Sequence, residues 1–379
     1  MKLKIVTFLF LFSLNAFSKE VSYLARSPKA LLMGDAFTAI ADDEYTLFYN
    51  PAALGRNQKV SITPIDPSFG LTNALDELDR FDNMPSDAPG IAGRMMDFPI
   101  YLQTGLAPTV KMAQFGLSLF LNQKTSMTLR NNTHPILDLN YRYDRGFIVG
   151  FAYNVGSGAK TSKISKSKKT ATSAGERLSV GFAVKHMNRE GVQNQFDLFG
   201  TKLLSSINSG ATSPTELKNA LGFSKGDAWG YDLGVEYSKS AGASTFTAGF
   251  SLLDVADTRF SKTSGTYGVP IQSMMANAGV AYKQDFGIFD YTLAADLHPF
   301  LGPVDFARQL HIGAEVSFPF ISLLAGYGEG YLSYGAAIDL WPFRLMTGFY
   351  SVEAGSKYKE QEASRFLLYL SLFDFSIDL

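Results

Sequence analysis

A strict alternation of apolar with small or polar residues runs through most of the chain and constrains its fold more than any other feature. In 229–238, Trp, Tyr, Leu, Val and Tyr alternate with Gly, Asp, Gly, Glu and Ser. The stretches 113–122, 147–155, 177–185 and 309–318 repeat this pattern. A period of two residues places each set of side chains on its own face of a β-strand. The sequence therefore predicts an all-β, antiparallel fold.

The alternating segments number about fourteen between Gln58 and the C-terminus, an even count typical of bacterial transmembrane β-barrels. Most run for roughly 9–11 residues, which matches the tilted path of a strand across a bilayer. The last stretch, 373–379, keeps the alternation to its final residue and is similar to the closing strand of outer-membrane barrels. A soluble sandwich or barrel, with its apolar face inward, is the alternative.

The second face of these strands is rich in glycine rather than in charged residues. A strand surface that meets water usually carries Lys, Glu and Thr, whereas small residues suit a lumen that admits another segment. Trp and Tyr residues on the apolar face lie near segment ends, as in the aromatic girdles of membrane barrels. We therefore expect the apolar face to contact outer-membrane lipid and the other face to line a lumen. The glycines of this face are Gly116, Gly150, Gly181, Gly234, Gly249, Gly279, Gly313 and Gly335.

The N-terminus has the composition of an export signal. Two lysines precede the apolar run Ile5 to Leu14, and Ala16-Phe17-Ser18 provides a small-x-small cleavage site. About ten apolar residues are too few for a membrane-spanning helix, so a cleaved signal peptide over 1–18 is predicted. Its expected destination is the outer membrane.

A short stretch rich in small residues precedes the first strand and differs from everything after it. Ser27 and Pro28 predict the start of a helix over 29–39, and Asn50-Pro51 predicts a rigid helical turn that Gly55 closes in the left-handed conformation. We predict that this stretch plugs the lumen. The predicted organisation is a signal peptide (1–18), an N-terminal plug or hatch (19–57) and a barrel (58–379), with long loops near 66–99, 156–176 and 189–228.

Candidate functional residues lie in the plug and on the lumen face. Asp42 and Asp43 either latch the plug to barrel Arg or Lys side chains or end its helix in a polar turn, since buried acids need partners. Gly34 belongs to the same stretch, and Asn50 and Pro51 are expected to be structural. The charged lumen residues either line a polar route or form a mutually compensating network, and we favour the network. They are Arg177, Lys185, Asp232, Glu236, Asp290, Asp296 and Glu315.

Composition and motif spacing exclude several classes of function. The chain has no cysteine, and its 34 basic and 35 acidic residues indicate no nucleic-acid partner. The four histidines lack the spacing of metal ligands, so neither a metal nor another cofactor is expected. Ser224 lies in a Gly-x-Ser-x-Gly match, but a helical segment precedes it and a strand follows, the reverse of a nucleophile elbow. No enzymatic activity is expected, and a lipid hydrolase that depends on Ser224 is kept as a third hypothesis.

The plug motif and the strands together resemble the FadL-type superfamily of plugged outer-membrane barrels, and within it PorV-type proteins. Residues 30–43 and 49–54 look like the N-terminal signature of that group, and 311–315 with 325–331 are similar to its late hairpins. The resemblance implies fourteen strands around an N-terminal hatch. It implies either passage of hydrophobic small molecules such as fatty acids or an outer-membrane shuttle for secreted proteins. We expect the first, with hatch displacement opening a route through the lumen or the wall.

Overall fold

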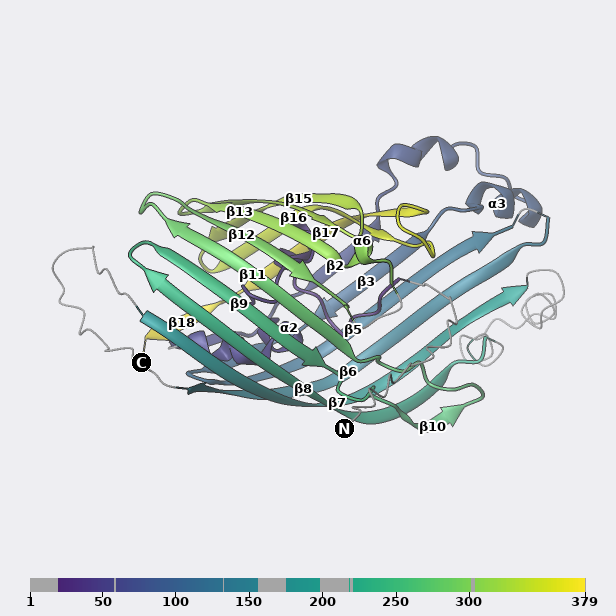
Figure 1. Cartoon of the computed structure of the whole chain (residues 1–379). Coiled ribbons are helices and arrows are strands. Elements are labelled where there is room, and N and C mark those ends of the chain that lie inside the picture. Colours follow the sequence, from purple (N-terminus) through teal and green to yellow (C-terminus); the bar gives the residue numbers. More distant parts are fainter. Residues whose placement is uncertain are drawn as a thin grey trace, which may run out of the picture.

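Strands dominate the described part of the chain in the computed structural model, which comprises residues 20–57, 59–131, 133–155, 175–197, 218, 221–300 and 304–378. Figure 1 shows the strands wrapped around the N-terminal segment, drawn in purple. The predicted signal peptide lies outside these residues, as do nearly all of the predicted loop 156–176 and the middle of the predicted loop 189–228. No helix of the described ranges is both long and apolar enough to cross a membrane.

The described strands form one antiparallel sheet of eighteen strands that closes on itself. In four places two consecutive strands continue each other along the same line: β1 and β2, β3 and β4, β9 and β10, and β17 and β18. The sheet is therefore a closed barrel of fourteen barrel strands, as predicted. The strands are β1 Lys59–Thr63, β2 Ser68–Thr72, β3 Ile100–Leu106, β4 Thr109–Met112, β5 Phe115–Arg130, β6 Ile136–Val155, β7 Gly175–Asp197, β8 Ser224–Ala241, β9 Ser244–Leu253, β10 Ser261–Gly265, β11 Met275–Asp285, β12 Asp290–Leu297, β13 Leu310–Ser317, β14 Ile321–Gly328, β15 Tyr331–Leu340, β16 Phe343–Glu353, β17 Glu362–Leu372 and β18 Phe375–Asp378.

Pairing between the first and last barrel strands closes the ring. In β1, Lys59 lies opposite Asp378 of β18, and β2 pairs with β17 through Thr72 and Arg365. Within the predicted closing segment 373–379, Phe375–Asp378 form β18, the final part of the last barrel strand. The prediction of a closed antiparallel barrel is confirmed.

The two faces of the strands have the predicted composition. Leu119 of β5, Phe151 of β6 and Trp229 of β8 point outward and are exposed by half or more of their surface. Leucines, phenylalanines and a girdle tryptophan on the outside are stable only against lipid. The fold is thus a transmembrane β-barrel of the outer-membrane type. Phe120 of β5 is buried on the inner face, where its ring packs against Phe48, with 5.7 Å between the ring centroids.

The N-terminal helix is much shorter than predicted. Helix α1 spans Pro28–Leu32, and its N-cap is Ser27, whose Oγ accepts from the N–H of Ala30 at 3.2 Å. The prediction of a helix over 29–39 is wrong, because Gly34 and Asp35 adopt positive φ angles of 65° and 67°. Beyond them the backbone N–H groups of Phe37 and Thr38 donate to a barrel side chain, Asp296, instead of continuing the helix. The chain then forms α2 (Thr46–Tyr49).

The predicted turn after Asn50 is present as the 3₁₀ helix η1 (Pro51–Arg56). The Asn50 side chain accepts from the N–H of Ala52 at 3.0 Å, and Pro51 begins the turn. Gly55 does not take the predicted left-handed conformation. Its missing side chain instead allows close approach to Ser179 and Asn154 of the wall.

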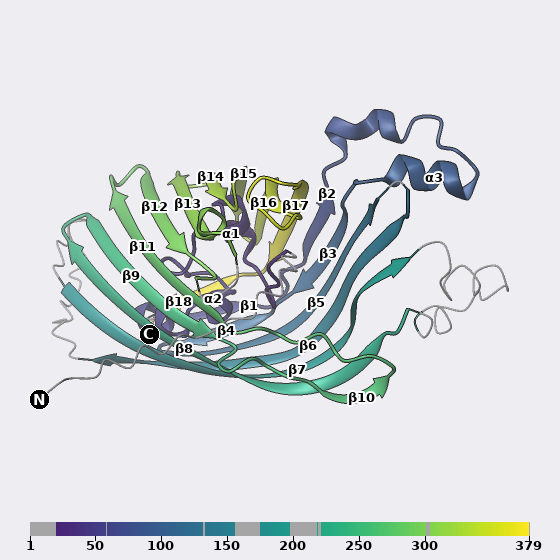
Figure 2. The ribbon, with the colours of Figure 1, turned by 45° about the vertical axis from the view of Figure 1, so that its right-hand side comes forward.

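Two predicted loops contain regular structure. The stretch 66–99 includes β2, the 3₁₀ helix η2 (Leu75–Arg80) and α3 (Ala88–Met95). Outside the predicted loops, a further short helix, α6 (Phe306–Gln309), lies between β12 and β13. The ends of the predicted loop 189–228 are strand, because β7 continues to Asp197 and β8 begins at Ser224. Strands β5 to β8 project beyond the others (Figure 2), and their projecting parts carry polar residues that hid the strand signal.

The glycine face of the wall is in direct contact with the N-terminal segment. A Cβ atom added to Gly313 would lie 2.5 Å from the carbonyl oxygen of Met33, and one added to Gly249 would lie 2.8 Å from that of Thr38. At Gly181 and Gly326 an added Cβ would overlap the backbone of Ala52 and Gly34 still more severely. Interiors packed this closely leave no room for a methyl group. The glycines therefore allow the N-terminal segment to lie against the wall.

We predict that Gly181→Ala lowers the stability of the plugged barrel by about 1–3 kcal/mol, because the new methyl group would overlap the backbone of η1. Gly175→Ala in the same strand, where nothing lies within 4 Å, is the matched control and should be neutral or slightly stabilising. The midpoint of heat-induced unfolding on semi-native gels compares the two variants. Equal midpoints would contradict the close contact between η1 and the wall.

Candidate functional site

The candidate site is the contact between the barrel lumen and residues 20–57, which we call the plug. Plug residues Leu32, Met33 and Phe37 are completely buried and belong to one core with inward-facing residues of the wall such as Ile148 and Met346. The plug therefore supplies the interior core of the barrel. Figure 2 shows α1 and α2 enclosed by the strands.

Several ion pairs join the plug to the wall. Glu20 of the plug pairs with Lys124 and Arg365 at 2.6 and 2.7 Å, and two further pairs involve lumen charges named from the sequence. The Nζ atom of Lys29 lies 2.8 Å from a carboxylate oxygen of Glu315 on β13. At the other end of the plug, Arg56 lies 3.1 Å from Glu236 on β8, which Arg177 of β7 also contacts at 3.1 Å. Removing one partner of a buried pair leaves an uncompensated charge and is strongly destabilising. These pairs therefore fix the plug in its seated position.

The turn at Gly34 and Asp35 is held by hydrogen bonds from several strands. The N–H of Gly34 donates to the Ser333 hydroxyl at 2.8 Å. Ring nitrogens of His311 and His298 lie 2.6 Å and 2.9 Å from the carbonyl oxygens of Gly34 and Asp35. These partners satisfy backbone groups that a helix would have paired internally. The backbone of Gly34, a residue of the N-terminal small-residue stretch, is thus bonded to the wall through both its N–H and its carbonyl.

Asp296 of β12 adds further hydrogen bonds between the wall and the plug. One of its carboxylate oxygens accepts the N–H groups of Phe37 at 2.8 Å and Thr38 at 2.6 Å. A carboxylate that receives two backbone N–H groups forms strong, directional bonds. Of the lumen charges named from the sequence, Arg177, Glu236, Asp296 and Glu315 lie at the plug contact.

Asp42 and Asp43 are arranged differently from the predicted latch. The Asp43 carboxylate accepts from the hydroxyl of Ser27 at 2.5 Å and the N–H of Tyr45 at 2.8 Å, and that of Asp42 lies 3.6 Å from Lys29. These closest carboxylate contacts are within the plug itself. The barrel cation at this point is Lys111 of β4, whose Nζ donates to the backbone carbonyls of Asp42 and Asp43 at 2.6 and 2.7 Å.

Asn50 has the structural role expected of it. It is fully buried, caps η1 and donates its side-chain amide to the carbonyl of Thr38 at 3.3 Å. It packs directly against Gly234 of the wall. The Asn-Pro turn therefore joins two parts of the plug to each other and to the barrel.

Lys185 and Asp232 contact a loop rather than the plug. Lys185 lies 2.8 Å from Asp232 and 3.0 Å from Asp254, the first residue of the segment 254–274, which we call the lid. In this part of the lumen, Lys185 thus lies between two carboxylates. Asp290 lies apart at the start of β12, where it pairs with Lys283 at 3.1 Å.

The lid is fastened by an arginine that the sequence did not single out. Arg189 of β7 is fully buried, pairs with both oxygens of Asp144 at 2.5 and 3.0 Å, and donates to the carbonyl of Pro270 at 2.8 Å. It also donates to the side chain of Gln272 at 2.9 Å, and Gln272 donates in turn to the carbonyl of Ser22 at 2.7 Å. The lid is thereby connected to the first residues of the plug.

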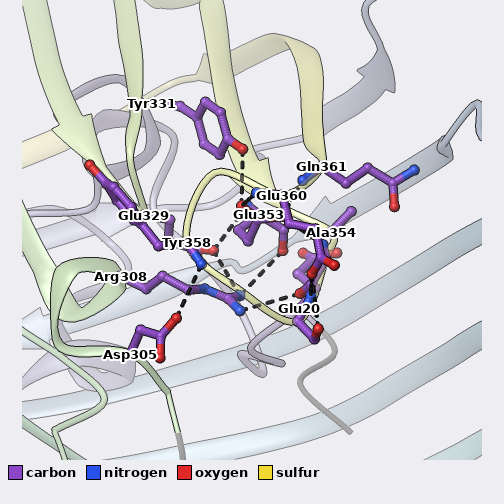
Figure 3. Close-up of polar contacts among 12 residues, drawn as sticks. Glu20, Asp305, Arg308, Glu329, Tyr331, Glu353, Ala354, Tyr358, Glu360 and Gln361 are labelled. Atoms are coloured by element: carbon purple, nitrogen blue, oxygen red, sulfur yellow. Dashed lines mark hydrogen bonds and ion pairs between the residues drawn. The ribbon is translucent and has the colours of Figure 1, made fainter.

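A second polar cluster fastens the loops at the other side of the mouth (Figure 3). The buried Glu353 carboxylate accepts from the Tyr331 hydroxyl at 2.9 Å and from the N–H groups of Gly355 and Gln361 at 2.7 and 2.8 Å. Arg308 of α6 donates to the carbonyl of Gly355 at 3.3 Å. The loops that follow β12, β14 and β16 are therefore joined into one rim.

The remaining sequence candidates have other surroundings. Ser224 is buried at the start of β8, and its hydroxyl donates to the carbonyl of Tyr267 in the lid at 2.6 Å. His298 and His311 stack with 3.8 Å between ring centroids and face backbone carbonyls. Within the described ranges, no three His, Asp or Glu side chains converge to hold a metal ion.

Comparisons with known proteins stop at the level of architecture. No family model matches the chain, and no curated protein does. Among solved structures, the chain is similar to the deltaS2 mutant of the TodX monoaromatic hydrocarbon channel, with 11% identity over 93% of this chain and 99% of that one and a TM-score of 0.49. The Pseudomonas putida toluene transporter TodX has 10% identity over 96% and 100%, and the CymD monoaromatic hydrocarbon channel 11% over 95% and 99%, each with a TM-score of 0.46. At such scores the comparison carries no argument about this chain, whose barrel rests on its own strand pairing.

Seating of the plug is predicted to weaken as pH rises. Burial, together with the neighbouring Glu44 and Asp42, raises the pKa of Asp43 from 3.8 to about 7. The seated plug thus binds more protons than a released one, so this contribution is fully present below about pH 4 and is lost as the pH rises to 7. Protease cleavage within the plug should be faster at pH 8 than at pH 5, and Asp43→Asn should reduce this difference. Faster cleavage at pH 5 would contradict the assignment.

Proposed function

We propose that the protein is an outer-membrane channel through which small hydrophobic molecules pass, and that the seated plug keeps it closed. In this proposal the chain reaches the outer membrane after removal of residues 1–18, and it transports rather than catalyses. The ligand leaves the lumen through the barrel wall into the hydrocarbon layer. Only an uncharged, apolar molecule gains from such a route, because a charged one would lose its hydration there.

One observation carries this proposal: three neighbouring barrel strands are interrupted at the same height. The interruptions lie at residues 64–67 between β1 and β2, 107–108 between β3 and β4, and 373–374 between β17 and β18. Register places them side by side, since Thr63 pairs with Thr109 and Ser68 pairs with Tyr369. We call this region the wall break.

The plug seals the wall break from inside. The hydroxyl of Thr109 donates to the carbonyl of Glu44 at 3.1 Å, and the hydroxyl of Tyr369 donates to the Glu44 carboxylate. Within the break, one oxygen of the fully buried Asp66 accepts the N–H of Ala107 at 2.8 Å, and the other has no hydrogen-bond partner among the described residues. Between the first and last barrel strands, backbone hydrogen bonds still cross this region, from the N–H groups of Leu370 and Leu372 to the carbonyls of Pro67 and Ile65 at 3.0 and 2.9 Å. Between the first and second barrel strands, the Asp66 side chain makes the contact, and the plug covers it from inside. Movement of Glu44 away from the wall would uncover a path to lipid.

The test weakens the plug without touching the wall break. Glu315→Gln removes the closer carboxylate partner of Lys29 and leaves only Asp42 at 3.6 Å. We expect it to increase the entry of the apolar dye N-phenyl-1-naphthylamine into whole cells severalfold, because a buried lysine with a weakened ion pair favours release of the plug. Entry of nitrocefin, a polar substrate that a periplasmic β-lactamase hydrolyses, should stay unchanged. Asp290→Asn, which breaks a pair remote from the plug, is the matched control.

Two results would contradict this function. Equal increases in dye and nitrocefin entry would indicate an aqueous pore through the lumen instead of a route through the wall. No increase for either compound, with the variant present in the membrane at the wild-type level, would contradict a gating role for the plug.

A second candidate function is an outer-membrane shuttle for secreted proteins. It is favoured by the apolar side chains of η2 and the segment after it, since Leu75 and Leu78 are more than half exposed and Met84 is also exposed. Large exposed apolar side chains of this kind often mark protein contacts. Specific binding of an exported protein that is lost in Leu78→Ser, with no dye entry in Glu315→Gln, would favour this candidate.

A further inference from the structure

An apolar groove lies beneath α3 at the projecting end of the barrel. It has a volume of about 300 Å³ and is lined on the α3 side by Ile91, Ala92, Met95 and Phe98, and on the strand side by Ile100, Met127, Leu129 and Leu137. Every lining side chain is apolar. Figure 2 shows α3 beside the far ends of β3 and β5.

The groove lies on the outward face of the wall. Along β5, Met127 and Leu129 have the same parity as the outward-facing Leu119 and Leu121, and the pairing of β5 with β6 runs without a bulge between them. Leu129 is nevertheless buried, because the insertion that carries α3 covers this part of the strand. The groove thus faces away from the lumen.

A band of polar residues separates the groove from the lipid-facing belt. On the same outward face, Gln123 and Thr125 follow Leu121 along β5. On β6 the exposed Arg145, which pairs with Leu121, donates to Asn188 of β7 at 3.2 Å and adjoins these residues. A charged residue on the outer surface is costly within the hydrocarbon region, so the membrane boundary lies below this band. Lipid chains therefore do not cover the groove.

Polar contacts at both ends of α3 keep the groove open. Arg80 donates to the carbonyls of Arg94 and Met96 at 2.7 and 3.2 Å, and its guanidinium lies 5.3 Å from the centre of the Phe98 ring. At the start of the helix, Asp87 accepts the N–H of Gly90 at 2.9 Å. These contacts position the helix without closing its apolar side onto the strands.

We propose that this groove is the capture site for an uncharged hydrocarbon of one or two rings, or a short alkyl chain, on its way to the barrel. Its volume is at the lower end of small-molecule sites, and a helix of a partner protein, about 10 Å wide, is too large for it. The absence of charge from its lining matches a ligand without charge. That the ligand is cargo rests on the proposed function, whereas binding in the groove can be measured independently.

The binding test uses the two methionines that line the groove. Protein with ¹³C-labelled methionine methyl groups, in lipid nanodiscs, is titrated with naphthalene and followed by NMR. We expect saturable shifts of Met95 and Met127 with one common dissociation constant. Met346, buried inside the barrel, should not move, and the exposed, lipid-facing Met112 should at most show the linear, unsaturable shift of lipid partitioning. Only linear shifts at Met95 and Met127 would overturn the proposal.

Two variants of α3 separate binding in the groove from other effects. Ala92→Phe fills the groove and should abolish the saturable shifts, whereas Gly93→Ala, at a position with open space around it, should leave them unchanged. In cells that carry Glu315→Gln, adding Ala92→Phe should slow dye entry. Undiminished entry would show that the groove is not on the route and would overturn the capture role, while the proposed channel function would stand.

Discussion

The close approach of the plug backbone to the barrel wall is the constraint on which the rest of the structure depends. Gly249, Gly313 and Gly326 face Thr38, Met33 and Gly34 at distances that no Cβ atom would permit. Because the surfaces fit closely, short polar contacts such as Lys29 with Glu315 and Asp296 with Phe37 can form as well. A plug held in this way has one well-defined seat, and a small shift breaks many contacts together.

The plug also links the two ends of the proposed route. Near its start, Ser22 receives a hydrogen bond from Gln272 of the lid, and Glu44 in its middle contacts Thr109 and Tyr369 at the wall break. Movement of the plug therefore changes contacts with the lid and with the lateral wall at once. A ligand that competes for the contacts at the mouth would bias the plug toward release only if it binds the released state better.

The sequence predicted the features that depend on residues close together in the chain, such as the alternation of side chains along each strand. Alternation identified the barrel, and the many glycines on the lumen face, such as Gly181 and Gly234, indicated that a slim segment lies inside. The helix predicted over 29–39 failed because its backbone bonds to Asp296 and Ser333, which are more than 250 residues away. Local propensity gives no information about such partners.

The candidate site could be predicted only in part, because its contacts join residues that are far apart in the sequence. Glu315 and Glu236 stood out as charges on a glycine-rich face, but the sequence did not identify Lys29 and Arg56 as their partners. The pair Asp42 and Asp43 stood out by its motif, yet the barrel residue Lys111 binds their carbonyls, which every residue has. The groove beneath α3 depends on how far β5 and β6 project, and polar residues masked that extension.

Hydrogen exchange of the plug in the intact protein, followed by mass spectrometry, tests the central claim most directly. Without ligand, peptides that cover residues 33–38 and 42–46 should exchange as slowly as the central barrel strands. With a saturating apolar ligand, exchange in these plug peptides should accelerate while the barrel strands remain protected. Plug peptides that stay equally protected with ligand, or that exchange freely without it, would contradict a seated plug that ligand releases.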